Sequence, residues 1–544
     1  MQVDKFENAA QVLQQLSESL PLLEHLDLSG TNLAGKVNST EEVASPLPGW
    51  PTGRKLKFLG LYFLCTSSPC RRENLPALRV AGDWNEEQRI TALEAYADAQ
   101  HVTRHLLHFI LCSQQSIWNI NGVNILRAPE HVFELLPERM HRYLSDKYVQ
   151  LYATALLVDH LLPQLGIENI SPMRLRTLVQ RLVDTLERYA QSNDPPSDLE
   201  NTCRHIVQNC VRILSEIKVS SYHLLYERLL TVLFLIAQRP RDNFDSYSHL
   251  KVLALNLLHS VLLHPMHISE SKSLFDKLDG LRVVLTILEQ EVLLEESVTL
   301  RLQVCEQLAH KCWLLVSFAT HKSPSNCQQF IDVDGLELFV NCVKRWPGSV
   351  HEKELKHAML LALANIAELK LLRGYLMTDQ LYTIFIELLD TSDANDNGIS
   401  YNTARVLSHL LAEGKDEWHQ NAFREDLEGA LLPVSPHSRA AIGERIIGAT
   451  ARWNPDVACD PTITYTSLIP ILSLITSFNS FASQYWAAWA LNNLSLVNPD
   501  IYCPMLFREG ALDILDTAIA DARSQDRFRH WLVLTADRLR QHTK

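Results

Sequence analysis

An amide and a carboxylate stand three residues apart inside an apolar stretch, where they could act together by hydrogen bonding and charge. Residues 361–373 read LALANIAELKLLR, which places Asn365 and Glu368 among leucines and alanines. Residues three apart share one face of an α-helix, so the two side chains would lie side by side. Either both face solvent, or they form one small polar site.

A second group with possible chemistry is the histidine series His101, His105 and His108. Their spacing of four and then three residues places them on one helix face, which is a possible metal-ligand geometry. No Glu follows the first His, and histidines on a repeat surface are more often solvated or capping. The sequence also lacks a phosphate loop, a Rossmann glycine motif and a G-x-S-x-G elbow. We therefore expect no metal, no cofactor and no catalytic residue.

The composition indicates a folded, helix-rich protein. The chain has 544 residues, of which 47% are hydrophobic and 21% are charged, with 18 Gly and 23 Pro. A net charge of -13 disfavours nucleic acid as a partner, because phosphate binding needs clustered Lys and Arg. The 11 Cys include no C-x-x-C pair, and no apolar run is long enough to span a bilayer. These features predict a protein of the cytoplasm and/or nucleus that does not insert into membranes.

The first part of the chain fits a leucine-rich repeat. Residues 22–33 read LLEHLDLSGTNL, and the inward positions would be Leu23, Leu26, Leu28 and Leu33. One repeat cannot bury its own face, so a single copy at residues 1–35 predicts that earlier repeats are missing. Residues 36–54 are rich in Pro, Ser and Gly and favour a linker. Residues 54–64 predict a strand that closes the region, so residues 36–79 are assigned to linker and closing strand.

From about residue 84 the pattern changes to helices of about 10 to 16 residues with apolar positions at i, i+3, i+4 and i+7. Similar helices recur about every 40 to 47 residues, which is the period of armadillo and HEAT repeats. We therefore predict an all-α, armadillo/HEAT-like solenoid over residues 80–544, preceded by the last repeat of a truncated leucine-rich region. The third helix of each repeat would line a concave groove, and Asn365 and Asn493 would point into it.

Asn493 allows two interpretations. As a structural residue, it would hydrogen-bond the backbone of a neighbouring repeat. As a functional residue, it would belong to a ladder of amides that holds an extended peptide. Trp489 lies four residues before Asn493 and shares its helix face, as a peptide-binding groove requires, although a Trp on an apolar helix is more often part of the core.

Residues 483–515, SQYWAAWALNNLSLVNPDIYCPMLFREGALDIL, resemble the end of the zyg-eleven and zer-one family, the substrate receptors of cullin-two RING ubiquitin ligases. Further stretches that look like family landmarks follow in the expected order: VAGDWNEEQRITALEAY at 80–96, DGLELFVNCVKRWP at 334–347, NIAELKLLRGYLMTDQ at 365–380 and SYNTARVLSHLLAEGKDEW at 400–418. The zer-one branch is the more similar one.

The resemblance implies a non-catalytic substrate receptor. Its N-terminal box would bind elongin B/C and cullin-two, and its armadillo groove would capture proteins whose exposed N-terminus begins with Gly or another small residue. Asn365 and Glu368 match the family's pocket positions. Glu368 would neutralise the substrate ammonium, which is mostly protonated at neutral pH, and Asn365 would hydrogen-bond the first peptide unit.

The chain departs from the family pattern in two places. Residues 310–324 read HKCWLLVSFATHKSP, which puts Ser317, Phe318 and His321 where the family has Trp, Asn and Asp. A His that can become cationic would repel an ammonium. We therefore expect binding of a different N-terminal residue or modification, such as a bulkier or acetylated one, or loss of N-terminal recognition. Nothing in residues 1–35 resembles a cullin-binding box, which puts direct ligase recruitment in doubt if the chain is complete.

The function that the sequence favours is substrate recognition in a cullin-two RING ubiquitin ligase, through N-terminal degrons bound at Asn365, Glu368, Ser317, Phe318, His321, Trp489 and Asn493. The alternative is an armadillo scaffold or transport adaptor that binds an extended peptide without ligase coupling. Recovery of elongin and cullin with the protein would separate the two.

Overall fold

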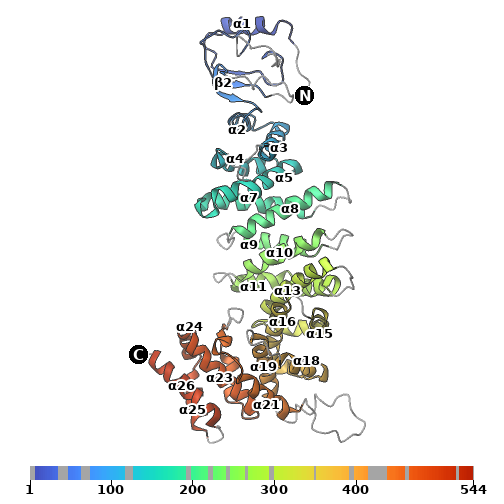
Figure 1. Cartoon of the computed structure of the whole chain (residues 1–544), viewed down its shortest axis with the longest axis vertical. Coiled ribbons are helices and arrows are strands. Elements are labelled where there is room, and N and C mark those ends of the chain that lie inside the picture. The colour runs from blue at the N-terminus through green and yellow to red at the C-terminus, as the bar shows by residue number, and fades with distance from the viewer. Residues whose placement is uncertain are drawn as a thin grey trace. The chain divides into compact units, whose positions relative to one another are not determined.

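The computed structural model describes residues 6–34, 47–62, 74–116, 126–191, 198–217, 225–239, 246–263, 268–292, 299–347, 351–390, 397–413, 438–459, 465–521 and 526–542. These residues form two compact units, residues 1–236 and 237–544 (Figure 1). Residues 36–46, from the predicted linker, lie outside the described residues. Among the described helices, none is both long and apolar enough to cross a bilayer.

The first unit begins with helix α1 (Ala9–Ser19) and a parallel sheet of strands β1 (His25–Asp27), β2 (Leu56–Gly60) and β3 (Ala77–Ala81). Leu26 is in register with Leu59, and Leu59 is in register with Val80. Successive parallel strands joined by long connections are the arrangement of leucine-rich repeats. The predicted strand is confirmed as β2, but it does not close the region, because β3, which was not predicted, pairs beyond it.

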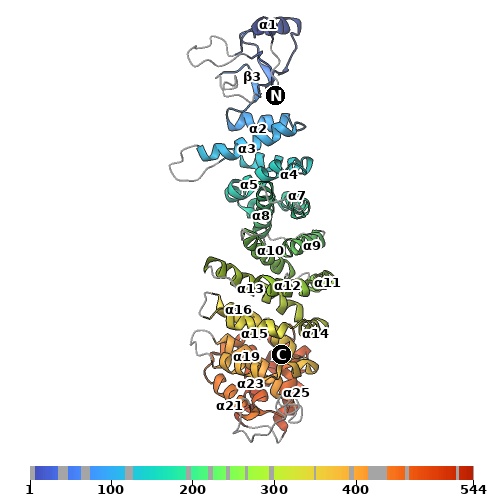
Figure 2. The ribbon, with the colours of Figure 1, turned by 90° about the vertical axis from the view of Figure 1, so that its right-hand side faces the viewer.

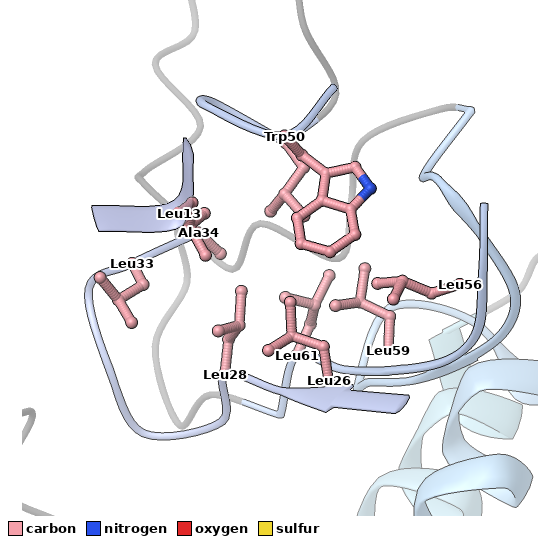
Figure 3. Packing of buried hydrophobic residues seen from close by; sticks show 10 residues of the cluster. Leu13, Leu26, Leu28, Leu33, Ala34, Trp50, Leu56, Leu59 and Leu61 are labelled. Carbon is pink, nitrogen blue, oxygen red and sulfur yellow. The ribbon is translucent and has the colours of Figure 1, made fainter. Parts of the chain in front are cut away.

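One hydrophobic cluster holds this region together. Leu26, Leu28 and Leu33 are buried in it, as their spacing predicted, while Leu23 packs against its edge. Figure 3 shows the Trp50 ring facing the strand residues across this core. Leu47 and Trp50 come from the stretch predicted to be linker, so the end of that stretch belongs to the folded core.

The rest of the first unit consists of helices. They are α2 (Glu86–Ala95), α3 (Gln100–Ser116), α4 (Pro129–Arg142), α5 (Lys147–Leu156), the π turn Leu157–Leu161, α6 (Leu162–Leu165), the 3₁₀ turn Ile167–Asn169, α7 (Pro172–Ala190), α8 (Asp198–Glu216) and α9 (Tyr226–Ala237), the last of which ends at the division. Helix α3 packs on α5 and α5 on α8, while α4 packs on α7. The unit therefore has an inner layer of α3, α5 and α8 and an outer layer that includes α4 and α7.

The second unit repeats this arrangement. Its helices are α10 (Ser246–Leu262), α11 (Ile268–Lys277), α12 (Gly280–Ile287), α13 (Thr299–Thr320), α14 (Pro324–Asp332), α15 (Gly335–Arg345), α16 (Glu352–Ala367), α17 (Arg373–Leu376), α18 (Asp379–Leu389), α19 (Gly398–Leu411), α21 (Arg439–Thr450), α22 (Ile469–Ile475), α23 (Phe481–Val497), α24 (Pro499–Arg508), α25 (Ala511–Ala520) and α26 (Asp526–His542), with a π turn at Leu288–Val292 and 3₁₀ turns at Lys370–Leu372 and Pro455–Cys459.

Helices α10, α13, α16, α19 and α23 pack on one another in sequence and form the inner layer of this unit. Figure 2 shows α13, α16 and α19 following each other along it. The same turn recurs before the outer helices α12, α15 and α25, where Asp279, Asp334 and Gly510 have φ values of 51°, 56° and 73°. A left-handed residue at each such junction lets a new helix start at an angle. The predicted all-α solenoid is confirmed.

Candidate functional site

Two inner helices of the second unit carry the central candidate residues. Ser317 and Phe318 lie in the last turn of α13, and His321 follows that helix. Asn365 lies near the end of α16, and Glu368 caps the same helix. Because α13 packs on α16, the ends of both helices come together, as the repeat pattern predicted.

The amide of Asn365 connects these two helices. Its Nδ2 donates to the backbone oxygen of Ser317 at 3.0 Å and to Oγ1 of Thr320 at 3.1 Å, and the residue is only 8% exposed. The Asn365 side chain also lies close enough to His321 to influence the pKa of that ring. Both donor hydrogens of the amide are therefore used inside the protein, as in the structural interpretation of such an Asn.

The carboxylate of Glu368 is paired with a residue that the sequence analysis did not consider. Its Oε1 accepts a hydrogen bond from Nη2 of Arg405, on helix α19. The two side chains are 18% and 7% exposed, so the ion pair is largely buried. Burial lowers the pKa of Arg405, but the neighbouring Glu368 carboxylate outweighs burial and the pKa is raised overall, so the guanidinium stays charged.

The segment 465–468, which precedes α22, reaches the same place. Thr466 Oγ1 lies 2.6 Å from Nε2 of His321, and the backbone oxygen of Thr466 accepts from Lys322 at 3.2 Å. Tyr465 places its ring 5.0 Å from the guanidinium carbon of Arg405, which is a cation–π contact. Its hydroxyl lies 2.7 Å from that of Tyr401. We call His321, Glu368, Arg405, Tyr465 and Thr466 the inner-face cluster.

His321 is neutral at physiological pH. Burial, followed by the nearby cations Lys272, Lys322 and Arg405, lowers its pKa to about 4. The sequence predicted a His that could become cationic, and the structure corrects that expectation because the ring is buried and lies near three positive groups. Several cations therefore lie close to His321, and the carboxylate of the inner-face cluster, Glu368, is neutralised by Arg405.

Ser317 and Phe318 do not present new chemistry to this cluster. The hydroxyl of Ser317 donates to the backbone oxygen of Leu314 in its own helix at 3.0 Å. Phe318 is 8% exposed and packs edge-to-face against Phe275 of α11, with ring centroids 5.8 Å apart. Phe318 is thus part of the core between α11 and α13.

Trp489 and Asn493 lie on α23 and are also buried. Trp489 packs against Trp453 with ring centroids 5.3 Å apart and against Tyr401 at 6.1 Å. Asn493 donates to the backbone oxygen of Trp489 at 2.8 Å, within its own helix. The two asparagines are therefore used differently, since Asn365 connects two helices and Asn493 does not.

Arg405, Tyr465 and Thr466 are the members of the inner-face cluster that the sequence analysis missed. A signal existed for Arg405, because it is a charge within the otherwise apolar helix GISYNTARVLSHLL. Nothing in the sequence marked Thr466, which lies 145 residues from His321. As for metals, no cluster of three or more His, Cys, Asp or Glu with ligand geometry occurs among the described residues.

Comparison with known proteins gives two family matches. Residues 138–538 match the model of the C-terminal domain of protein zer-1 homolog-like proteins, and residues 1–64 match the model of Zer-1-like leucine-rich repeats. The second match includes β1 and β2.

Individual relatives agree with these matches. The chain is 29% identical to protein zer-1 homolog of Mus musculus over 96% of this chain and 61% of that protein. It is 29% identical to Zyg eleven-related protein 1 of Caenorhabditis elegans over 94% of this chain and 52% of that protein. The chain thus spans between about half and two thirds of these relatives. An engineered protein of known crystal structure, 13% identical, aligns with a TM-score of 0.41 over 83% of this chain and 98% of its own.

Proposed function

The chain belongs to the zer-1-like family, and from this premise we propose that it is the substrate-binding part of a cullin-two RING ubiquitin ligase receptor. Its partners would be substrate proteins with exposed N-termini and, for the whole protein, cullin-two and elongin B/C. It would catalyse no step itself. By holding a substrate beside the ubiquitin-loaded enzyme, it would raise the local concentration of that substrate. The proposed location is the cytoplasm and/or nucleus.

The observation that carries this proposal is the inner-face cluster. Its members come from the ends of α13 and α16, from the middle of α19 and from the segment 465–468, so several separate elements bring hydrogen-bonding side chains to one place. Two of them, His321 and Glu368, occupy positions that the family resemblance assigns to N-terminal recognition. Thr466 is exposed, which leaves this side of the cluster accessible.

The charges of the cluster favour a substrate N-terminus without an ammonium group. A free ammonium would meet a carboxylate that Arg405 already neutralises, together with Lys272 and Lys322. The substrate ammonium and these lysine ammonium groups would repel each other, and more strongly in a partly buried site than in water. An acetylated N-terminus has no charge and still offers a carbonyl and an N–H. We therefore propose that this groove prefers acetylated over free N-termini.

Thr466 holds the hydrogen-bonding position on His321 that such a substrate would take. The neutral imidazole can exchange one neutral partner for another at little cost in charge. A bound N-terminus would then compete with the segment 465–468 and displace Thr466 from His321.

The test is fluorescence-polarisation binding of the full chain to peptides that differ only in the first residue and its acetylation. We expect acetylated peptides to bind at least about tenfold more tightly than free Gly peptides, corresponding to about 1.4 kcal/mol. Equal or tighter binding of free Gly peptides would contradict the proposal. Glu368→Ala should change this preference, whereas Glu444→Ala, at an exposed position on α21, is the matched control.

Ligase coupling requires a separate measurement. Co-purification of cullin-two and elongin B/C with the native protein supports a receptor. A stable peptide complex without either protein supports the alternative, a scaffold or transport adaptor.

A further inference from the structure

A cavity of about 420 Å³ opens between α3 and α5 of the first unit. Its lining residues are His101, Arg104, His105, His108, Tyr148 and Tyr152. The four residues from α3 follow the helical spacing i, i+3, i+4 and i+7, and the two tyrosines of α5 are four residues apart, so each helix contributes one continuous face. The volume lies within the range of about 300 to 1,000 Å³ that is typical of ligand sites.

The side chains that line the cavity are held in place by contacts with one another and with Tyr62. The Tyr62 hydroxyl lies 2.5 Å from Nδ1 of His105, and burial lowers the pKa of His105, so this ring is held in a neutral state. The His108 ring packs on Tyr152 with centroids 4.9 Å apart. Tyr148 and Tyr152 are stacked at 6.3 Å, and Tyr148 is 38% exposed. The site therefore presents aromatic faces in a defined arrangement.

Two cations flank the exposed ring. The guanidinium carbon of Arg104 lies 5.6 Å from the centroid of Tyr148, and Nζ of Lys147 lies 5.0 Å from it. Within the described part of the chain, neither Arg104 nor Lys147 forms an ion pair. The neighbouring carboxylate of Asp146 accepts from Gln100 at 2.7 Å and from the backbone N–H of Tyr148 at 2.9 Å, so it caps α5. Arg104 and Lys147 therefore keep their charges out of ion pairs among the described residues, although the Asp146 carboxylate is close enough to Tyr152 to raise the pKa of its hydroxyl.

Burial raises the pKa of the Tyr152 hydroxyl, which therefore remains a proton donor at neutral pH. A guanidinium offers a planar set of N–H donors that matches the two oxygens of a carboxylate or phosphate. An ammonium and two phenol hydroxyls add further donors. The flat tyrosine faces suit the apolar part of a side chain or a peptide plane.

We propose that this cavity binds a peptide side-chain oxyanion, a carboxylate or a phosphate, within an extended segment of a partner protein. A peptide fits better than a nucleic acid, because the net charge of -13 would repel a polyphosphate backbone while one local anion can still be held. This site is separate from the inner-face cluster of the second unit, and the proposal does not depend on coupling to a ligase.

The experiment uses the full chain and short fluorescent peptides of one sequence that carry Glu, phosphoserine or Gln at a central position. We expect the Glu or the phosphoserine peptide to bind at least about tenfold more tightly than the Gln peptide, and the two arms identify which oxyanion is preferred. Arg104→Ala and Tyr148→Ala should each remove this preference. Arg176→Ala, an exposed arginine on the outer helix α7, should leave it unchanged.

Equal binding of the Gln peptide, or no effect of Arg104→Ala, would overturn the proposal. So would tighter binding of a single-stranded RNA than of any peptide in competition. Arg104→Lys keeps the charge but loses the planar donors, so it should retain part of the affinity. Thermal unfolding of each variant shows whether a lost signal reflects the site or the fold, because Arg104 is exposed and should not change the midpoint.

Discussion

The carboxylate of Glu368, at the end of α16, is ion-paired with the guanidinium of Arg405, in the middle of α19 and 37 positions further along the chain. This ion pair determines how strongly the inner-face cluster attracts a charged substrate N-terminus. A free carboxylate at Glu368 would attract an ammonium, whereas a paired one offers it little. The same pair also contributes to stability, because a buried charge that loses its partner costs about 3–5 kcal/mol.

Removing the arginine should therefore have two effects. In Arg405→Ala, Glu368 is left without its partner, so the midpoint of thermal unfolding should fall. The free carboxylate should also increase the affinity for free Gly peptides by about tenfold relative to the acetylated form, as measured by fluorescence polarisation. The double variant Glu368→Gln/Arg405→Ala should recover stability and lose the gain in affinity. A gain that persists in the double variant would show that Glu368 is not the acceptor.

Asn365 and Asn493 allow a direct comparison of two buried amides. Asn365→Ala removes donors to Ser317 and Thr320 on a neighbouring helix, so we expect a loss of about 1–3 kcal/mol. Asn493→Ala removes a bond to a backbone oxygen of its own helix and should cost less. The midpoint of chemical unfolding measures both. A larger effect at Asn493 would show that its burial matters more than its hydrogen bond.

Helical periodicity predicted that Asn365 and Glu368 share a helix face; in the structure their side chains bond to different helices, Asn365 to α13 and Glu368 to α19. The sequence also predicted that α13 and α16 are neighbours, because repeat spacing determines which helices stack. It did not predict that Glu368 is neutralised, because the partner Arg405 lies on another helix and periodicity carries no information about pairing across repeats. Thr466 reaches His321 from a loop, for which no periodic pattern exists.

In the N-terminal region, too, the sequence predicted the periodic positions and missed the residues outside the periodic pattern. The leucines at 26, 28 and 33 could be assigned to the core from repeat spacing, and they are buried. Strand β3 was missed because ALRVA is short and only Ala81 is fully buried, so its apolar residues do not alternate in the way that a half-buried strand requires. Trp50 was missed because Pro and Gly around it indicate a loop, yet loops of leucine-rich repeats can bury an aromatic residue.

The buried neutral histidines should make the free energy of unfolding depend on pH. His409 is fully buried, neither ring nitrogen has a hydrogen-bond partner among the described residues, and burial, followed by Arg373 and Arg405, lowers its pKa well below the ordinary value. His259, His310 and His321 have pKa values lowered to about 4, mainly by burial. Below pH 6.5 the unfolded chain takes up protons that the folded chain does not, so stability is lost as the pH falls from about 6.5 toward about 4.

Thermal unfolding between pH 8 and pH 5 measures this dependence. We expect the midpoint to fall on acidification. His409→Leu removes one of the groups and also removes two unpaired buried nitrogens, so it should raise the midpoint, and more at pH 5 than at pH 8. His249→Leu, at an exposed position on α10, serves as the control. A pH profile that is identical in His409→Leu and the parent chain would show that His409 is protonated without cost.

Thr466 offers the most direct test of how a substrate enters the inner-face cluster. Its hydroxyl is 2.6 Å from Nε2 of His321, and Val has nearly the same shape without the hydroxyl. Thr466→Val should weaken the attachment of the segment 465–468 to His321 by about 0.5–1.5 kcal/mol, because one hydrogen bond is lost. If a substrate N-terminus takes the same position on His321, the variant binds an acetylated peptide more tightly, since less of the binding energy is needed to displace the segment.

Hydrogen exchange then distinguishes competition from simple loosening. In the parent chain, a saturating acetylated peptide should speed exchange at segment 465–468, because Thr466 leaves His321. In Thr466→Val the exchange should already be faster without peptide and change little on binding. Thr476→Val, which removes a hydroxyl that donates to the backbone oxygen of Ser473 in α22, should alter neither exchange at 465–468 nor affinity. Slower exchange of the segment on peptide binding would instead mean that it closes over the substrate, and the proposed competition for His321 would be wrong.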